Sequence, residues 1–269
     1  MTGVHPRLAV NALCSRDWTF DQDLALWRKV RLHHVSLWAR KLDQDRRAKI
    51  AALRAAGMRI ATVVSGTVAL DAPRTWAASR AAIASSVRDA ATTEGRSVYV
   101  TPGRSDGRSW HELLDAFADA VGPSVADAAA HGVRLSIEPS LRCDVSFVNT
   151  LRDAVDVAEA TGVGLVVDFG NCWMERDFEK VVRRAAPHIG LVQLCDIRLG
   201  PGTQAAGDRV LPGEGFLPLA RMLTTVLDTG YDGLFDLEVL GPDIEREGYE
   251  STVGRGARIG SELLASLGI

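Results

Sequence analysis

An alternation of short β-rich runs with long amphipathic runs repeats eight times along this 269-residue chain and limits its fold more than any other feature. The β-rich runs cover residues 7–11, 34–38, 59–65, 97–101, 134–138, 164–168, 191–196 and 234–240. The helical runs cover residues 20–30, 45–56, 75–93, 109–130, 151–160, 178–186, 217–228 and 254–267. Strands separated each time by a helix run parallel, and eight such units close into a barrel. The sequence predicts a single (β/α)8 TIM barrel in the α/β class.

Glycines and loops support the same architecture. The glycines at 57, 132, 162, 190 and 230 each stand between a helical run and the next strand, where a left-handed residue is needed. A doubly wound open sheet is the alternative, but residues 11–15 read N-A-L-C-S and lack its glycine-rich phosphate turn. We find no linker and expect one domain over residues 1–269. The longest predicted loops, 199–215 and 241–253, both follow strands, on the face where barrels keep their active sites.

Composition narrows the class of protein. The formal charge of −3 and the absence of a basic block disfavour nucleic-acid binding. The four cysteines, at 14, 143, 172 and 195, form no C-x-x-C pair, which disfavours a zinc finger and fits a reduced compartment. No secretory signal and no apolar run of membrane-spanning length is visible. We therefore expect a cytoplasmic protein without a membrane partner.

Four predicted strands in succession each direct one oxygen-bearing side chain into the barrel. Side chains alternate along a strand, so the apolar partners of each pair should face the helices. By this parity the inward residues near the strand tips are Glu138, Asp168, Gln193 and Glu238. Three carboxylates crowded at one point would repel each other unless a cation neutralised them. The all-oxygen donor set predicts one divalent metal ion, Mn²⁺ or Mg²⁺, with Co²⁺ as a further candidate.

Several motifs resemble those of the xylose-isomerase-like barrel superfamily, the sugar phosphate isomerase/epimerase group. Residues 137–144, I-E-P-S-L-R-C-D, resemble its E-P-x-x-R-x-[E/D] segment, and residues 167–171, V-D-F-G-N, resemble its D-x-x-H. Residues 211–215, L-P-G-E-G, are similar to its P-G-E-G turn. Residues 230–233, G-Y-D-G, followed by Glu238 resemble the pattern that closes the barrel.

The resemblance implies the same metal ligands: Glu138 on strand 5, Asp168 on strand 6, Gln193 on strand 7 and Glu238 on strand 8. Two positions depart from the family pattern, because Gln193 and Asn171 stand where histidines are usual. A glutamine on strand 7 is similar to the dehydroshikimate-dehydratase branch, which eliminates water. The resemblance also implies a homodimer as the common assembly.

The expected chemistry begins with loss of an α-proton from a small polyhydroxy ketone or sugar, through an enediolate that the metal stabilises. The resemblance implies that Glu138 and Glu238 are the catalytic residues, one removing the proton and the other returning it. Further candidates for substrate binding are Arg142, Asp144, Arg198, Trp38 and Trp173. Asp196 is a candidate to support the metal ligands, and Glu214 a candidate to order the glycine turn.

Three alternatives remain beside an isomerase or epimerase. A lyase of the dehydroshikimate-dehydratase type would use the same metal and the same first step. An endonuclease for abasic DNA is the next alternative, and the resemblance implies a histidine-rich site with three zinc ions for that activity. This chain lacks those histidines and any basic stripe. A barrel that binds a ligand without turnover is the last alternative. The loops after predicted strands 1 to 3 should determine substrate specificity, but they contain no recognisable substrate-binding motif.

Overall fold

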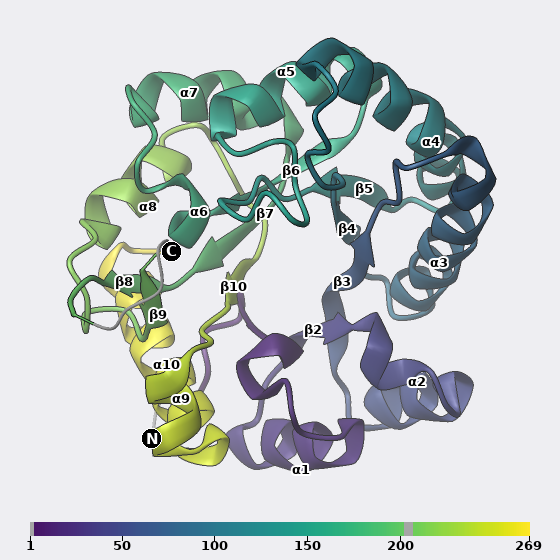
Figure 1. The fold of residues 1–269 in the computed structure, drawn as a ribbon. Helices are drawn as coiled ribbons and strands as arrows, with labels where there is room; N and C mark the ends of the chain where they lie inside the picture. Colours follow the sequence, from purple (N-terminus) through teal and green to yellow (C-terminus); the bar gives the residue numbers. More distant parts are fainter. Residues whose placement is uncertain (1–2, 202–206) are drawn as a thin grey trace.

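Eight parallel strands close into a barrel in the computed structural model, which describes residues 3–201 and 207–269 (Figure 1). Around the barrel the strands follow one another as β1 (Leu8–Asn11), β10 (Phe235–Leu237), β7 (Ile189–Leu194), β6 (Gly164–Asp168), β5 (Arg134–Ile137), β4 (Ser97–Thr101), β3 (Arg59–Thr67) and β2 (His34–Trp38). The predicted (β/α)8 barrel is confirmed.

Long helices form an outer ring around the strands (Figure 1). They are α1 (Phe20–Val30), α2 (Arg46–Ala55), α3 (Pro73–Thr92), α4 (Trp110–Ala130), α5 (Leu151–Thr161), α7 (Phe178–Ala185), α8 (Leu219–Leu227) and α10 (Tyr249–Ser266). Sequence signals define where several of them begin. Thr19 and Ser109 precede α1 and α4 and form capping boxes. In each box the hydroxyl accepts a hydrogen bond from a backbone N–H of the first turn, and a Gln or Glu side chain of that turn accepts from the backbone N–H of the Thr or Ser.

Short helical segments follow several strands and shape the carboxyl end of the barrel. They are η1 (Ala12–Ser15), η2 (Ala39–Leu42), α6 (Phe169–Cys172) and α9 (Pro242–Glu247), while η3 (Ala186–His188) precedes β7. None of them was predicted, because segments of three to six residues are too short to show helical periodicity. No helix among the described residues is long and apolar enough to cross a membrane.

Both long loops expected from the sequence contain regular structure. Within the predicted loop 199–215, β9 (Asp208–Val210) pairs antiparallel with β8 (Asp196–Arg198), and residues 202–206 lie outside the described part. The predicted loop 241–253 contains α9 and the first turn of α10. Gly190 was also assigned wrongly, because it lies inside β7, where an added Cβ would be 2.7 Å from the Ser136 hydroxyl. It is close approach, not a left-handed backbone, that requires glycine there.

The barrel interior is apolar below the strand tips. Val64, Tyr99, Val166 and Leu191, from four different strands, form one buried cluster inside the barrel. Residues of opposite parity, such as Leu165 and Val167, belong instead to the large core between strands and helices. Tight packing inside the barrel leaves only its two ends open for ligands.

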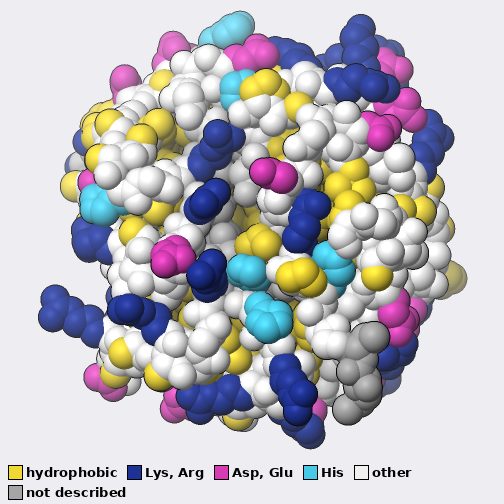
Figure 2. Space-filling model, turned by 180° about the vertical axis from the view of Figure 1, so that it is seen from behind, with side chains coloured by type: hydrophobic (Ala, Val, Ile, Leu, Met, Phe, Trp, Pro, Cys, Tyr) yellow, Lys and Arg dark blue, Asp and Glu magenta, His cyan; other side chains and the backbone are white. Residues whose placement is uncertain are grey.

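The barrel has a hollow at each of its two ends. Figure 2 shows the amino end, where Lys and Arg side chains surround a hollow, and the structure gives it a volume of about 770 Å³ with Arg59, Arg96 and Arg134 in its wall. The carboxyl end holds a separate cavity of about 570 Å³ that contains Glu138 and Glu238. Glu138 and Glu238 line this second cavity, which is the candidate site.

Candidate active site

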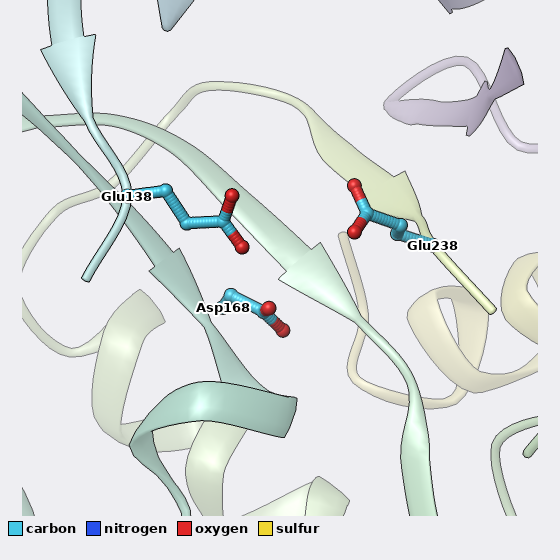
Figure 3. Close-up of side chains that lie close together, drawn as sticks. All are labelled: Glu138, Asp168 and Glu238. Atoms are coloured by element: carbon cyan, nitrogen blue, oxygen red, sulfur yellow. The ribbon is translucent and has the colours of Figure 1, made fainter. Parts of the chain in front are cut away.

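Three buried carboxylates converge at the carboxyl end of the barrel. Glu138 follows β5, Asp168 ends β6 and Glu238 follows β10, and each offers an oxygen that lies within 4.8 Å of the others. Figure 3 shows the carboxylates of Glu138 and Glu238 pointing toward each other from opposite sides, with Asp168 beside them. Their side chains are only 0–7% exposed, so water screens their mutual repulsion poorly.

Three donors fix one oxygen of Glu238. Its Oε2 accepts from Asn11 Nδ2 at 2.9 Å, from the Tyr99 hydroxyl at 3.1 Å and from Gln193 Nε2 at 2.6 Å. All three donors are buried and come from different strands, β1, β4 and β7. The carboxylate is thereby held in one orientation, with Oε1 on the side of the other acids, 3.5 Å from Arg209 Nη1.

Asn171 joins the other two carboxylates. Its Nδ2 donates to Glu138 Oε1 at 2.9 Å and to Asp168 Oδ2 at 2.8 Å. Asp168 also caps α6, because its Oδ1 accepts from the Gly170 backbone N–H at 2.8 Å. The short helix α6 therefore begins directly after β6, because Asp168 caps it. The helix places Asn171 within hydrogen-bonding distance of Glu138 and Asp168.

Arg209 is the guanidinium of this cluster. It lies on β9, is 15% exposed, and its Nη2 donates to Asp168 Oδ2. Burial acts to lower the pKa of Arg209, but the carboxylates of Asp168, Glu238 and Glu138 raise it well above its ordinary value. Arg209 therefore stays charged and neutralises part of the acidic cluster.

A fourth carboxyl lies one layer deeper in the barrel. Asp236 on β10 accepts from the Ser36 hydroxyl at 2.7 Å and from Asn11 Nδ2 at 2.8 Å. Burial raises the pKa of Asp236 to about 6 and that of Glu238 to about 8. Burial and the neighbouring carboxylates also raise the pKa of Glu138 well above its ordinary range. The protein alone leaves these groups short of positive charge.

The residues of the cluster fit a divalent cation. Among the described residues, four buried carboxyls share the single guanidinium of Arg209, so the cluster carries excess negative charge when they are ionised. In addition, Gln193 Oε1 is buried and has no hydrogen-bond partner, although Nε2 of the same amide donates to Glu238. Three carboxylates and an unpartnered amide oxygen are the donors that Mg²⁺ and Mn²⁺ prefer.

Of the residues predicted to bind substrate, Trp38 and Arg142 line the cavity of the acids. Arg142 forms an ion pair with Asp144, in which both side chains are more than 60% exposed. Such an exposed pair contributes little to stability. The contact that orients Glu138 comes from Asn171 instead of this pair, because Arg142 and Asp144 satisfy each other in solvent.

Arg198 does not reach this cavity. Its guanidinium pairs with Asp243 on α9, and the reason is the register of the β8–β9 hairpin. Arg209 is the cross-strand partner of Ile197 and shares its face, which lines the cavity, whereas the next residue, Arg198, points to the other face. The structure therefore brings Arg209 of this hairpin, and not Arg198, to the cavity of the acids.

Trp173 also faces elsewhere. It lies against Phe216, with ring centroids 5.2 Å apart, and lines a separate hollow beside α7 and α8. Gly170 and Asn171 of α6 line the cavity of the acids. Trp173 lies two residues after Asn171, and two residues of helix turn the direction of a side chain by about 200°. Trp173 therefore points away from the cavity of the acids.

Asp196 orders the glycine turn. Its carboxylate accepts from the backbone N–H groups of Gly213 at 3.0 Å and Leu217 at 2.9 Å. A Cβ at Gly215 would lie 2.3 Å from Asp196 Oδ1, which explains the glycine. Glu214 pairs with Arg255 on α10 and so ties the same turn to the last helix. Asp196 therefore acts on the loop, not on the acids that it was expected to support.

Sequence reasoning missed Asn11, Tyr99 and Arg209. Asn11 and Tyr99 share the inward parity of β1 and β4, so the alternation that located the acids also contained the signal for them. Arg209 stands just before the P-G-E-G turn, but only the hairpin register places it among the carboxylates.

Residues 25–261 match the family described as xylose isomerase-like TIM barrel, which is most of the chain. The chain belongs to this family. An inosose isomerase of Halalkalibacterium halodurans is 29% identical over 121 residues, which are 43% of each protein. The chain thus matches less than half the length of this relative.

Solved structures share the fold over nearly the whole chain. The IolI protein with a bound zinc atom has a TM-score of 0.82 at 16% identity, covering 97% of this chain and 98% of its own. D-Psicose 3-epimerase of Clostridium cellulolyticum H10 gives 0.77 at 16% identity, with coverage of 96% and 97%. A probable 3-DHS dehydratase, AsbF of Bacillus anthracis, gives 0.74 at 12% identity, with coverage of 94% and 98%. At these identities the likeness concerns the fold alone.

Proposed function

We propose that this chain is a divalent-metal-dependent isomerase or epimerase that acts on a small polyhydroxy ketone or sugar. The observation that supports the proposal most strongly is the convergence of Glu138, Asp168 and Glu238, buried and within 4.8 Å of one another at the carboxyl end of the barrel. Membership of the xylose isomerase-like family and the partial match to an inosose isomerase point in the same direction.

Glu138, Asp168, Gln193 and Glu238 would hold the ion. A bound divalent cation supplies a Lewis acid that polarises a substrate carbonyl and favours loss of the neighbouring proton. Asn171 keeps Glu138 and Asp168 in a fixed relation, and Asn11 with Tyr99 does the same for Glu238. Fixed carboxylates lower the cost of reaching the reactive geometry.

Glu138 and Glu238 would carry the proton. They approach the centre of the cluster from opposite sides (Figure 3), so a substrate bound between them presents one face to each. One carboxylate takes the α-proton, and the other delivers a proton to the opposite face, which inverts that carbon. Burial raises the pKa of both groups in the ion-free protein, and a bound cation would lower both again, which favours the ionised form that accepts a proton.

Proton exchange with solvent tests this proposal. A panel of neutral and anionic ketoses is incubated with enzyme and Mn²⁺ in D₂O, and NMR follows deuterium at the α-carbon together with the epimer formed. The proposal expects exchange with at least one ketose, and removal of the ion by a chelator stops it. Absence of exchange across the panel, with Mn²⁺ bound, would contradict the proposal.

A lyase of the dehydroshikimate-dehydratase type is the second candidate. Gln193 favours it, because a glutamine on strand 7 is similar to that branch, and here it is buried and donates to Glu238. The first step, loss of the α-proton, is common to both reactions. Loss of a β-hydroxyl as water, seen as new ultraviolet absorbance of the product, would decide for the lyase.

A further inference from the structure

Four arginines line the cavity above the acids. They are Arg16 after β1, Arg40 after β2, Arg142 after β5 and Arg209 on β9, while Glu138 and Glu238 are the acids in the wall. A cavity that binds a neutral sugar needs groups that hydrogen-bond to hydroxyls, but it does not need more guanidinium groups than carboxylates. The question is which of these positive charges lacks a partner.

The four guanidinium groups differ in how far carboxylates neutralise them. Arg209 is buried against Asp168 and Glu238, and Arg142 donates twice to Asp144. Arg16 has only distant partners, because Asp17 lies at 3.7 Å and Glu245 at 3.6 Å. These separations exceed those of direct hydrogen bonds.

Arg40 has no such partner. It forms no ion pair with a carboxylate in the part of the chain that the structure describes, and its guanidinium carbon lies 5.0 Å from the centroid of the Trp38 ring. Stacking on an indole orders a guanidinium while leaving its N–H groups free to donate. Trp38 lines the same cavity, so the pair forms an ordered cationic corner at the end of β2.

From this arrangement, and on the basis of the function proposed above, we infer that the substrate carries an anionic group, a carboxylate or a phosphate, bound by Arg40 with Arg16 beside it. In the closed barrel β2 lies opposite β6, the strand that ends in Asp168. A substrate that spans the mouth would place its carbonyl at the acids and its anionic end on Arg40. The wall of the same cavity also includes neutral residues such as Val64, Thr67 and Thr101.

Binding of three unreactive polyols tests the inference. D-Gluconate, D-glucitol 6-phosphate and D-glucitol share a six-carbon chain and carry a carboxylate, a phosphate or neither. Calorimetric titration of the Mn²⁺-loaded protein should show one of the anions binding at least about tenfold more tightly than glucitol, as expected for a charge-assisted contact. Whichever anion binds more tightly identifies the group.

Substitutions assign the preference to Arg40. Arg40→Met should remove the advantage of the anion and leave glucitol binding unchanged, and Arg40→Lys should retain part of it. Arg54→Met is the matched control, because Arg54 is an exposed arginine of α2 outside the cavity. If Arg40→Met keeps the full preference, the anion binds elsewhere, for example to the metal, and the inference is wrong. Equal binding of all three polyols, or no binding of either anion, overturns it too.

The test is separate from that of the proposed function. None of the three polyols has a ketone or aldehyde group, so their binding does not depend on turnover. If the ketose panel shows no α-proton exchange while Arg40 still selects an anion, the enzymatic proposal fails and the binding site stands. If a neutral ketose exchanges its proton and no anion is preferred, the reverse holds.

Discussion

Arg209 on the β8–β9 hairpin places its guanidinium against the carboxylate of Asp168 at the end of β6, where Asp168 is fully buried and Arg209 is 15% exposed. Two segments distant in sequence thereby join at the centre of the candidate site. The positive charge of Arg209 offsets part of the repulsion among the three converging carboxylates. The remaining negative charge is what a bound cation would balance.

Removal of the Arg209 charge should destabilise the protein. Breaking a buried ion pair leaves a carboxylate without compensation, so Arg209→Met should lower the free energy of unfolding by about 3–5 kcal/mol in metal-free protein. Denaturant unfolding measures this. Arg221→Met is the control, because Arg221 is 75% exposed and pairs with Glu179 at the surface. Equal, small effects of the two substitutions would contradict a large contribution of the Arg209–Asp168 pair to stability.

Glu238→Gln should slow proton transfer by a large factor without unfolding the protein. The substitution removes a carboxylate that can take a proton, and loss of such a group costs between about 100-fold and 10,000-fold in rate. Rates of α-proton exchange measure the loss, and circular dichroism verifies the fold. Glu262→Gln, at an exposed Arg258 pair on α10, serves as the control. Full activity of Glu238→Gln would remove Glu238 from the mechanism.

The choice of metal should depend on Gln193. Imidazole favours zinc, whereas amide and carboxylate oxygens favour Mn²⁺ and Mg²⁺. We expect Gln193→His to raise the affinity for Zn²⁺ relative to Mn²⁺ by about tenfold or more in a competition titration. An unchanged ratio of the two affinities would mean that residue 193 does not contact the ion.

A buried pair outside the site should make stability depend on pH. Asp23 on α1 and Lys41 on η2 form a buried ion pair at 2.6 Å, and burial, opposed by Lys41, raises the pKa of Asp23 from 3.8 to about 6. A raised pKa means that the folded protein binds this proton more tightly than the unfolded chain. Its contribution to the free energy of unfolding is therefore largest below pH 4 and is lost as pH rises through 6.

Asp23→Asn tests this dependence, because asparagine does not titrate. Denaturant unfolding of both proteins between pH 4 and 7 should show the stability of the wild type, relative to the variant, falling by up to roughly 3 kcal/mol as pH rises. A relative stability that stays level or rises over this interval would contradict the raised pKa.

The fold and the positions of the acids could be predicted from patterns among neighbouring residues in the sequence. Alternation along each strand is a property of neighbouring residues, so Glu138, Asp168 and Glu238 could be assigned to the barrel interior from sequence, and the structure brings them together. The same pattern fixed the strands, apart from their ends and the β8–β9 hairpin.

Contacts between distant segments could not be predicted in this way. Arg198 and Arg209 are both arginines near the tip of β7, and only the cross-strand register selects Arg209 for the cavity. Trp173 was expected in the substrate pocket, but the short helix α6 turns it away toward Phe216. The side chains of Arg198 and Trp173 both lie outside the cavity of the acids, and both residues belong to segments that are too short to show a periodic pattern in the sequence.

Counting the Mn²⁺ ions bound per chain tests the central claim most directly. Titration of metal-free protein, followed by calorimetry or by the paramagnetic signal of free Mn²⁺, should show one ion per wild-type chain and a large loss of affinity in Asp168→Asn. A wild-type chain that binds no Mn²⁺, or an Asp168→Asn variant that binds it as tightly as the wild type, would contradict a metal centre built on these carboxylates.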